Sequence, residues 1–436
     1  MVFPHRKMHL NLFFYPGGHH EAGWRYRDTP PESINDVRFY QQLTQRAEQA
    51  RFDAIFLADS PSLPHDVRYT SRPRIEPLTW LSAISSVTSH IGLIGTASTT
   101  YYEPFNLARL FASLDHLSAG RAGWNIVTTS AAAAAANFGL DAHPAHEERY
   151  KRAEEFIEVV SRLWDSWEED AIVADKAEGI FANTDKIRPI DHHGHYFDVK
   201  GPLSTSRTPQ GRPVYVQAGS SPEGRAFAAR HAEAIFTAHQ TLESAQAFYK
   251  DIKHRAGESG RPSGLPLVLP GVSPFIADTE VAAQQLEEEF NELIQPEYSL
   301  GILKAQLGVE FSLEDLDRPV DIAAINEASP LAKASRFQLI ADIVRREQPT
   351  LRQLTHRLAG ARGHIVVTGT PEQVADHLEQ WFRQGAADGF NVMPPWFPGG
   401  FDRFAEEVVP LLQQRGLFRT DYEGSTLREH YGLETP

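Results

Sequence analysis

The stretch GRAGWNIVTTSAAAAAANFG, which covers Gly120–Gly139, contains a short apolar run between a glycine turn and a polar end. Its segment Ala122–Thr128 combines tryptophan, isoleucine and valine, as expected of a strand that is buried on both faces. Residues 128–130 then place three hydroxyl groups at the end of the strand, before six alanines at 131–136. Because barrel strands deliver functional side chains at their carboxyl ends, this stretch predicts one strand of a ligand-binding α/β protein.

The same arrangement recurs along the 436 residues, where short apolar runs alternate with helix-like segments. Eight runs are expected to be strands: His9–Tyr15, Ala54–Ala58, Ile91–Thr99, Ala122–Thr128, Pro213–Gly219, Ala234–Ala238, Pro266–Ala277 and Gly389–Pro394. Eight parallel strands that alternate with helices close into a barrel. The sequence therefore predicts the α/β class and a TIM-type (β/α)8 barrel, in one elaborated domain that spans residues 1–436.

Three stretches are longer than a minimal barrel needs, at about 129–148, 165–212 and 278–363. Loops at the carboxyl ends of barrel strands carry functional residues and accept long insertions. We therefore expect these insertions at the C-terminal face of the strands, where they would cover the site.

Composition restricts the class of protein. The formal net charge of -15 argues against a nucleic-acid partner, because such proteins place basic patches at the contact surface. The chain has no cysteine, so it has neither disulfides nor a thiolate metal site. The opening MVFPHRKMHLNLFFYP reads as a strand before a turn, and not as a signal peptide or a membrane span. A cytoplasmic protein without a membrane partner is expected.

Small polar side chains stand at the expected strand ends. Asp59 follows AIFLA, Thr96 lies in GLIGTAST, and Asn125 and Thr128 lie in GWNIVTT. Such a set is suited to hold a ligand by hydrogen bonds, and it lacks paired acids for cleavage. For Asp59, a helix cap or an ordinary loop carboxylate is an equally good interpretation.

The segment AGSSPEGRAF predicts a helix that starts beside a strand end. Ser221 is a candidate N-cap, Pro222 occupies the favoured first position, and Glu223 lies in the first turn. Free backbone N–H groups beside the hydroxyls of Ser220 and Ser221 would bind an anion such as a phosphate. The alternative is that both serines only cap the helix.

Several histidines and one tyrosine are further candidates for ligand-binding or metal-binding residues. His146 and Tyr150 are four residues apart, so both face the same side of the expected helix, although Tyr150 also begins an apolar stripe. The clusters His19–His20 and His192–His195 invite a metal hypothesis, but neither has the spacing of a zinc helix. No metal site is expected. The chain also lacks a P-loop, a G-x-G-x-x-G fingerprint and a G-x-S-x-G elbow.

Several long motifs together resemble one enzyme family. They are GRAGWNIVTT with ANFG, HEERYKRAEEFIEVVSRLWDSW, HHGHYFDVKGPL, PQGRPVYVQAGSS, ARHAEAIFT and GFNVMPPWFPGGFDRFAEEVVPLLQQRG. In this order they are similar to the bacterial luciferase-like flavin monooxygenases, and within them to the subgroup of nitrilotriacetate, dibenzothiophene sulfone and long-chain alkane monooxygenases. The resemblance extends from about His9 to Ala238 and continues in the C-terminal region.

The resemblance implies a flavoprotein oxidoreductase with a two-component mechanism. A separate NAD(P)H:flavin reductase would supply reduced FMN, which would react with O2 to give a C4a-peroxyflavin that oxygenates a small organic, possibly sulfur- or nitrogen-containing, substrate. The FMN contacts would fall on residues that match the family pattern or line the same strand end: Asp59, Thr96, Asn125, Thr128, His146, Tyr150, Ser220 and Ser221. Ala136 stands where the pattern has a basic residue, so this chain lacks that side chain. A homodimer or homotetramer is expected from the family.

The flavin intermediate must be protected from water, so an apolar cover is expected over the site. Aromatic candidates for substrate contacts are Phe13, Tyr15, Trp24, Phe138 and Trp396. No residue stands out as a general acid or base, and His19 and His20 are only weak candidates. Most of the chemistry would belong to the flavin.

Three other interpretations stay open at this point. A deazaflavin-dependent oxidoreductase uses a related barrel for hydride transfer. A metal-dependent barrel hydrolase would need the histidine clusters to converge on an ion. A non-catalytic flavin-binding relative is compatible with the alanine at position 136.

Overall fold

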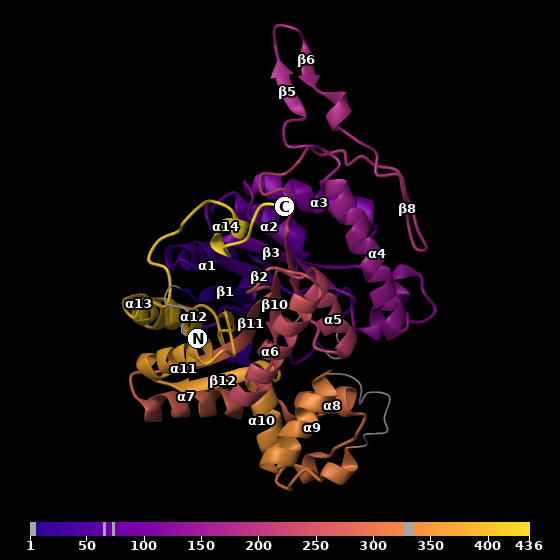
Figure 1. Cartoon of the computed structure of the whole chain (residues 1–436). Coiled ribbons are helices and arrows are strands. Elements are labelled where there is room, and N and C mark those ends of the chain that lie inside the picture. The colour runs from indigo at the N-terminus through magenta and orange to yellow at the C-terminus, as the bar shows by residue number, and fades with distance from the viewer. Residues whose placement is uncertain (1–5, 64–66, 72–74, 326–334) are drawn as a thin grey trace.

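A computed structural model of the chain describes residues 6–63, 67–71, 75–325 and 335–436. Its centre is a closed barrel of eight parallel strands, which confirms the predicted fold (Figure 1). The barrel strands, in the order in which they pair, are β1 (His9–Phe14), β2 (Ala54–Leu57), β3 (Gly92–Ser98), β4 (Ala122–Val127), β9 (Val214–Gln217), β10 (Ala234–Thr237), β11 (Leu267–Ile276) and β13 (Gly389–Val392). Strand β13 pairs with β1 and closes the barrel. All eight predicted strands are present.

Helices surround the barrel, as the alternating pattern predicted (Figure 1). They are α1 (Val37–Gln49), α2 (Pro77–Ser85), α3 (Pro104–Leu117), α4 (His146–Trp164), α5 (Pro222–His231), α6 (Leu242–Glu258), α11 (Pro371–Arg383), α12 (Gly399–Arg403) and α13 (Val409–Gln414). Helix α4 shows how they pack: Ala153, Phe156 and Val160 recur at helical spacing and are fully buried. Trp124 of β4 is also fully buried and contacts Phe156 with ring centroids 5.8 Å apart. The core between β4 and α4 therefore arises from the apolar patterns seen in the sequence.

The first insertion follows β4 at the carboxyl end of the barrel. Its alanine run forms the 3-10 helix η3 (Ala132–Phe138), which Gly139 ends in the left-handed conformation with φ 71°. Ala136 is exposed on this helix, and Asn137 Nδ2 donates to the carbonyl of Pro61 at 2.8 Å. Helix α4 begins at His146, within the range predicted for this insertion.

The second insertion does not lie where it was expected. It joins the end of α4 to the start of β9, so it lies at the amino-terminal end of the barrel strands. Every connection from a helix back to a parallel strand runs at that end, so the predicted C-terminal placement of residues 165–212 is corrected. The insertion contains two hairpins, β5 (Ile172–Asp175) with β6 (Ile180–Ala182) and β7 (His192–His193) with β8 (Asp198–Val199). Figure 1 shows the first hairpin projecting away from the barrel.

The third insertion lies at the carboxyl end and forms a helical unit, apart from residues 326–334, which are outside the described residues. It contains α7 (Glu280–Glu292), α8 (Pro296–Leu307), α9 (Ser335–Glu347) and α10 (Leu351–Ala361). Side chains of α8, α9 and α10, including Leu303, Phe337 and Leu354, form an apolar core separate from that of the barrel. This unit lies below the barrel in Figure 1.

One strand of the main sheet was not predicted. Strand β12 (Ile365–Gly369) pairs in parallel with the second half of β11, from Val272 to Ile276, whereas the barrel strand β13 pairs with Gly271 and Val272 of β11. The run IVVTG has the β-branched composition of a strand, but it directly follows the long third insertion. This strand brings residues from the end of the insertion back to the barrel.

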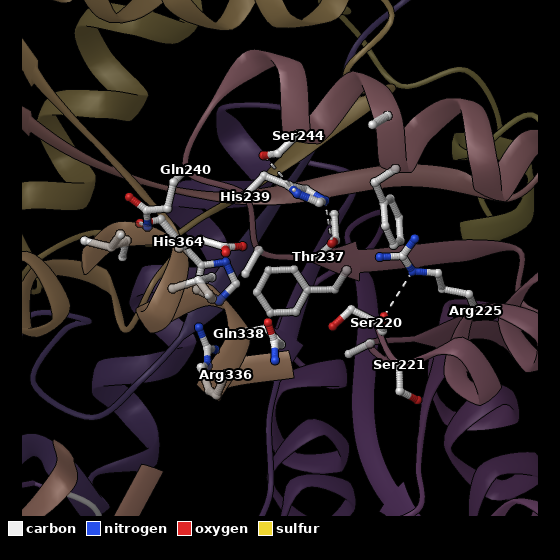
Figure 2. A pocket seen from close by; sticks show the side chains of 18 of the residues that line it. Ser220, Ser221, Arg225, Thr237, His239, Gln240, Ser244, Arg336, Gln338 and His364 are labelled. Carbon is white, nitrogen blue, oxygen red and sulfur yellow. Dashed lines mark hydrogen bonds between the residues drawn. The ribbon is translucent and has the colours of Figure 1, made fainter. Parts of the chain in front are cut away.

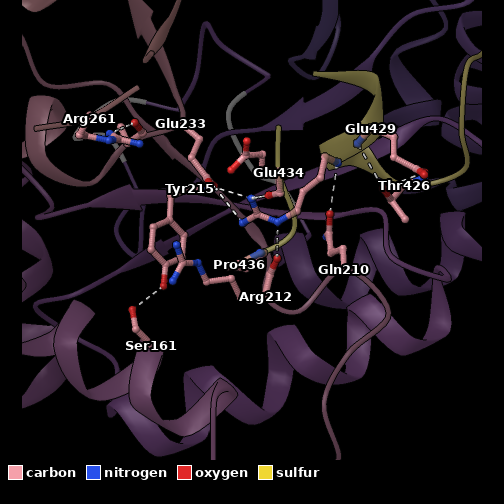
Figure 3. A network of polar contacts seen from close by, with 12 residues as sticks. Ser161, Gln210, Arg212, Tyr215, Glu233, Arg261, Thr426, Glu429, Glu434 and Pro436 are labelled. Atoms are coloured by element: carbon pink, nitrogen blue, oxygen red, sulfur yellow. Dashed lines mark hydrogen bonds and ion pairs between the residues drawn. The ribbon is translucent and has the colours of Figure 1, made fainter. Parts of the chain in front are cut away.

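The C-terminal segment closes the amino-terminal end of the barrel. Helix α14 (Leu427–His430) carries Arg428, which is 2% exposed and contacts Glu233 through two bonds, Nη1–Oε1 at 2.7 Å and Nη2–Oε2 at 3.2 Å. Oε2 of Glu233 also accepts from the backbone N–H of Tyr215 at 2.8 Å. Figure 3 shows this network with Glu233, Tyr215 and Glu434 labelled. None of the described helices is long and apolar enough to cross a bilayer.

Candidate active site

A pair of polar side chains lies inside the barrel at the ends of β3 and β4. Thr96 and Asn125 are neighbours in the strand register, and Asn125 Nδ2 donates to Thr96 Oγ1 at 2.8 Å. Thr96 Oγ1 in turn donates to the carbonyl of Leu57 at 2.7 Å. These bonds orient the amide, and Oδ1 of Asn125 is buried without a hydrogen-bond partner among the described residues. Since buried polar atoms are normally paired, this oxygen is suited to accept a bond from a ligand N–H.

Tyr150 connects the end of β4 to the start of α5. Its side chain forms hydrogen bonds with Thr128 and Ser221, and burial raises the pKa of its phenol. A Cβ atom at Gly219 or Gly224 would lie only 2.9 or 2.8 Å from the Tyr150 hydroxyl oxygen. The two glycines therefore allow the close approach of Tyr150, and the structure brings together three residues that the sequence placed apart.

Two further predicted residues lie at the edge of this group. The His146 ring is 5.0 Å from that of Tyr150 between centroids, and its Nδ1 lies 3.8 Å from a carboxylate oxygen of Glu223. About half of the His146 side chain, 47%, is exposed. Asp59 follows β2 and is half-buried. Its carboxylate acts on the phenol of Tyr102: burial, together with the carboxylates of Glu76 and Asp59, raises the pKa of Tyr102 to about 12.

The start of α5 has the predicted geometry. Ser221 is the N-cap and its Oγ accepts from the N–H of Gly224 at 3.1 Å, with Pro222 at the first helical position. Arg225 Nε donates to the carbonyl of Ser220 at 3.0 Å, which fixes the turn before the helix. Ser220, Ser221 and Arg225 line one cavity, so hydroxyl groups, a guanidinium and a helix N-terminus face the same space.

Two adjoining cavities lie at the carboxyl end of the barrel, where the helical insertion approaches it. The larger has a volume of about 570 Å³ and the smaller about 280 Å³. Phe236, Arg336 and His364 line both. Figure 2 shows Ser220, Ser221 and Arg225 on one side of the larger cavity and Arg336 and His364 on the other.

Several residues of these walls were missed by the sequence analysis. His239 lies two residues after the end of β10, so the strand-end argument applied to that strand would have found it. Burial lowers the pKa of His239 to about 4 and that of His364 well below its usual range, so both are neutral near pH 7. His364 precedes the unpredicted strand β12, and Arg336 belongs to the helical insertion. No sequence pattern places those two beside the barrel.

The predicted aromatic residues separate into two groups. Phe13 lines the smaller cavity, and Tyr15 is covered by the guanidinium of Arg362, whose Cζ lies 4.1 Å from the ring centroid. The other three do not line these two cavities. Trp24 donates to the carbonyl of Tyr69, the half-exposed Phe138 stacks on Tyr101, and Trp396 packs against Tyr26 and Phe290.

The candidate acid–base residues have structural partners. His19 is buried, with Nε2 2.8 Å from the carbonyl oxygen of Phe13 and Nδ1 2.6 Å from Nη2 of Arg362. This geometry fits a neutral ring that donates from Nε2 and accepts at Nδ1. His20 packs against Phe275 and Phe290, and burial lowers its pKa to about 3. His20 is thus neutral near pH 7 and does not line either cavity.

The second histidine cluster lies on the hairpin β7–β8. His192 Nε2 is 3.1 Å from a carboxylate oxygen of Glu155 on α4, and His193 Nδ1 is 2.9 Å from one of Asp198. Within the described residues, no group of three potential ligands is arranged to hold a metal ion.

A closed barrel with polar side chains and cavities at its carboxyl end defines an α/β-barrel enzyme. Residues 13–388 match the luciferase-like monooxygenase family. The chain is 48% identical to N-acetyl-S-(2-succino)cysteine monooxygenase from Bacillus subtilis (strain 168), over 100% of this chain and 99% of the relative. It is 46% identical to nitrilotriacetate monooxygenase component A from Aminobacter aminovorans, over 99% of this chain and 97% of the relative.

A solved structure shows the same architecture. Riboflavin lyase, in complex with modified FMN and riboflavin, superimposes with a TM-score of 0.86 at 32% identity, covering 99% of this chain and 97% of the other. This chain therefore belongs to the luciferase-like monooxygenase family and is an oxidoreductase, as the sequence motifs predicted.

Proposed function

We propose that this protein is the oxygenase component of a two-component flavin-dependent monooxygenase, which uses reduced FMN and O2 to oxygenate a small organic substrate that contains sulfur or nitrogen. The names of the two relatives describe a sulfur compound and a nitrogen compound, and one of them is called a component of its enzyme. The flavin in the riboflavin lyase structure supports the choice of cofactor.

The observation that carries the proposal is the buried Oδ1 of Asn125, which has no hydrogen-bond partner in the part of the chain that the structure describes. An isoalloxazine ring has an N–H that such an oxygen accepts, and its other polar edge atoms suit the nearby hydroxyls of Thr96 and Thr128. The phosphate of the same cofactor would lie at the start of α5, with Ser220 and Ser221 as ligands. The side chains present fit both ends of FMN.

The chain would bind and shield the cofactor, because its side chains supply little chemistry of their own. Reduced flavin, when bound, supplies the activation of O2 that amino-acid side chains cannot provide. Tyr150 is neutral near pH 7, since burial raises its pKa, and it would hold the hydroxyls of Thr128 and Ser221 in place. Phe13 and Phe236 line the cavities and would exclude water from the reacting centre.

The proposal is tested by anaerobic titration of the protein with reduced FMN, followed by rapid mixing with oxygenated buffer and recording of the flavin absorbance. Stoichiometric binding and a slower flavin oxidation than in free solution are expected, because the site excludes water. Substrate candidates are then screened by O2-dependent consumption. Failure to bind reduced FMN would contradict the proposal. Preferential binding of a deazaflavin would instead support a deazaflavin-dependent oxidoreductase that catalyses hydride transfer.

The supply of reduced FMN would come from an NAD(P)H:flavin reductase, since the chain has no dinucleotide fingerprint. Substrate oxidation is therefore expected with NADH only when a reductase is added, and without one when chemically reduced FMN is provided. Homodimer or homotetramer formation stays a prediction, which sedimentation equilibrium measures directly.

A further inference from the structure

The walls of the two cavities are basic, although the chain carries a net charge of -15. Among the described lining residues, four are arginines and two are acids: Arg225, Arg336, Arg346 and Arg362 against Glu21 and Asp342. An excess of guanidinium groups in a cavity of an acidic protein requires a physical reason.

Most of these charges have partners. Arg225 pairs with Asp251 at 3.1 Å, Arg346 with Glu347 at 2.5 Å, and Asp342 with Arg345 at 2.6 Å. Glu21 accepts a hydrogen bond from Ser299 Oγ at 2.8 Å. With these ion pairs set aside, Arg336 and Arg362 share the wall of the smaller cavity with one carboxylate, that of Glu21, so this wall keeps an excess of positive charge.

Arg336 has no carboxylate partner among the described residues. Its Nη1 donates to the carbonyl of Arg362, and burial, together with the charge of Arg362, lowers its pKa to about 10. It is charged near pH 7 nonetheless. Two like charges held close together at a buried wall are unfavourable unless an anion binds between or beside them.

The second guanidinium is held in a fixed orientation. Arg362 ends α10 in the left-handed conformation with φ 52°, lies over the ring of Tyr15, and contacts Nδ1 of His19 at 2.6 Å. Beside it, the neutral ring of His364 stacks on Phe236, with centroids 4.9 Å and planes 8° apart. The wall therefore combines a preorganised cation with flat apolar surface.

We propose that Arg336 and Arg362 form a subsite that binds a carboxylate group of the substrate, so that the substrate is an organic carboxylate anion; this rests on the proposed function. Guanidinium forks bind carboxylates through paired, charge-assisted hydrogen bonds. Phe13, Phe236 and Leu358 would contact the carbon skeleton of the same molecule.

The other anion in this system is the phosphate of the flavin. Ser220, Ser221 and the start of α5 lie across the larger cavity from Arg336 (Figure 2). Two separate anion-binding walls on opposite sides of one space suit a phosphate on one wall and a carboxylate on the other.

The test uses the full-length protein, with and without bound oxidised FMN, and two probes of the same shape, succinate and its neutral diamide succinamide. Binding of each is measured by ligand-observed NMR or calorimetry for the wild type, Arg336→Gln and Arg362→Gln. The matched control is Arg318→Gln, an exposed arginine of the same insertion that pairs with Asp315. Thermal unfolding verifies that each variant is folded, and Arg336→Lys, which keeps the charge but loses the fork, provides a milder substitution.

Succinate is expected to bind the wild type at least about tenfold more tightly than succinamide, and Arg336→Gln to abolish most of this preference. The preference of Arg336→Lys for succinate should lie between those of the wild type and Arg336→Gln. In Arg318→Gln this preference should change less than about twofold, and the affinity for FMN should also change less than about twofold in every variant. Equal binding of the two probes, or a preference unaffected in both glutamine variants, would overturn the proposal.

A third result assigns the subsite to the cofactor. If Arg336→Gln weakens FMN binding as strongly as succinate binding, and inorganic phosphate competes with FMN only in the wild type, then the arginines bind the flavin phosphate and the carboxylate subsite is refuted. If the protein binds no FMN but distinguishes the two probes, the subsite stands and the proposed flavin function fails.

Discussion

Asn125 Nδ2 donates a hydrogen bond of 2.8 Å to Thr96 Oγ1, and the opposite end of the amide, Oδ1, is buried with no hydrogen-bond partner among the described residues. The two residues come from neighbouring strands whose register places them side by side. A buried acceptor without a donor is costly, so this oxygen is a position where a ligand N–H would be stabilised. We infer that the ligand site begins at this amide.

Asn125→Leu is expected to weaken the binding of FMN without destabilising the flavin-free protein. The substitution removes an unsatisfied acceptor from the apo state but leaves a ligand N–H unpaired, a loss of about 1–3 kcal/mol. The dissociation constant, measured by flavin fluorescence, should rise about 5- to 150-fold.

Asn11 offers the matched control for this change. Its amide is buried in the same barrel but fully paired, with Asn391 at 3.1 Å and Tyr431 at 2.8 Å. Asn11→Leu should therefore lower the unfolding midpoint of the flavin-free protein, whereas Asn125→Leu should not. Equal destabilisation by both would remove the argument for a ligand at Asn125.

The double variant Ser220→Ala with Ser221→Ala is expected to weaken reduced-FMN binding, because each lost charge-assisted bond to a phosphate contributes roughly 1.5–3 kcal/mol. Anaerobic titration measures the change. Ser221→Ala also removes the cap of α5, which costs about 1 kcal/mol of stability, so the single Ser220→Ala variant separates binding from capping. Unchanged affinity in the double variant would exclude these serines from the site.

The stability of the protein should decrease in mild acid, in part through His20. Burial lowers the pKa of His20 to about 3 in the folded state, against a usual value of about 6.5 in an unfolded chain. The unfolded state therefore binds a proton as the pH falls below 6.5, while the folded state stays neutral until about pH 3, so the free energy of unfolding falls in this window. For one such group the loss at pH 5 is about 2 kcal/mol.

Urea denaturation at pH 8 and pH 5 tests this expectation in the wild type and in His20→Leu. The variant should lose less of its free energy of unfolding between the two pH values, whatever its absolute stability. Identical losses in the two proteins would mean that His20 becomes protonated without unfolding.

Arg428→Met should reduce the free energy of unfolding by about 3–5 kcal/mol, because it leaves the buried carboxylate of Glu233 without its partner. Adding Glu233→Gln should restore part of this loss, as judged from urea denaturation midpoints. The folded variant should bind FMN as the wild type does, since Glu233 directly precedes β10, at the amino-terminal end of the barrel, and the candidate site is at the carboxyl end. A loss below about 1 kcal/mol would show that the tail contributes little to closing the barrel.

The sequence predicted most of the barrel because each strand is buried on both faces and must be apolar over its whole length. The same regularity placed Thr96 and Asn125 toward the carboxyl ends of their strands and Ser221 at the start of a helix, and the structure has Thr96 and Asn125 in the second halves of β3 and β4 and Ser221 as the N-cap of α5. It failed for residues 165–212, since length alone does not tell at which end of the barrel an insertion lies. Strand β12 was missed although IVVTG is a strand-like run, because no ninth strand is needed to close a barrel.

The sequence by itself determined the barrel, the strand-end polar residues and the start of α5, because these depend on periodicity and on neighbours in the chain. Only the tertiary structure decided that Tyr150 reaches Ser221 between two glycines, that Oδ1 of Asn125 has no hydrogen-bond partner within the described residues, and that Arg336 lies beside Arg362. These relationships join segments that are separated in the sequence, and they are set by how the strands, the surrounding helices and the helical insertion pack together. No local pattern encodes that packing, because it depends on the shapes of two surfaces that form only when the chain has folded.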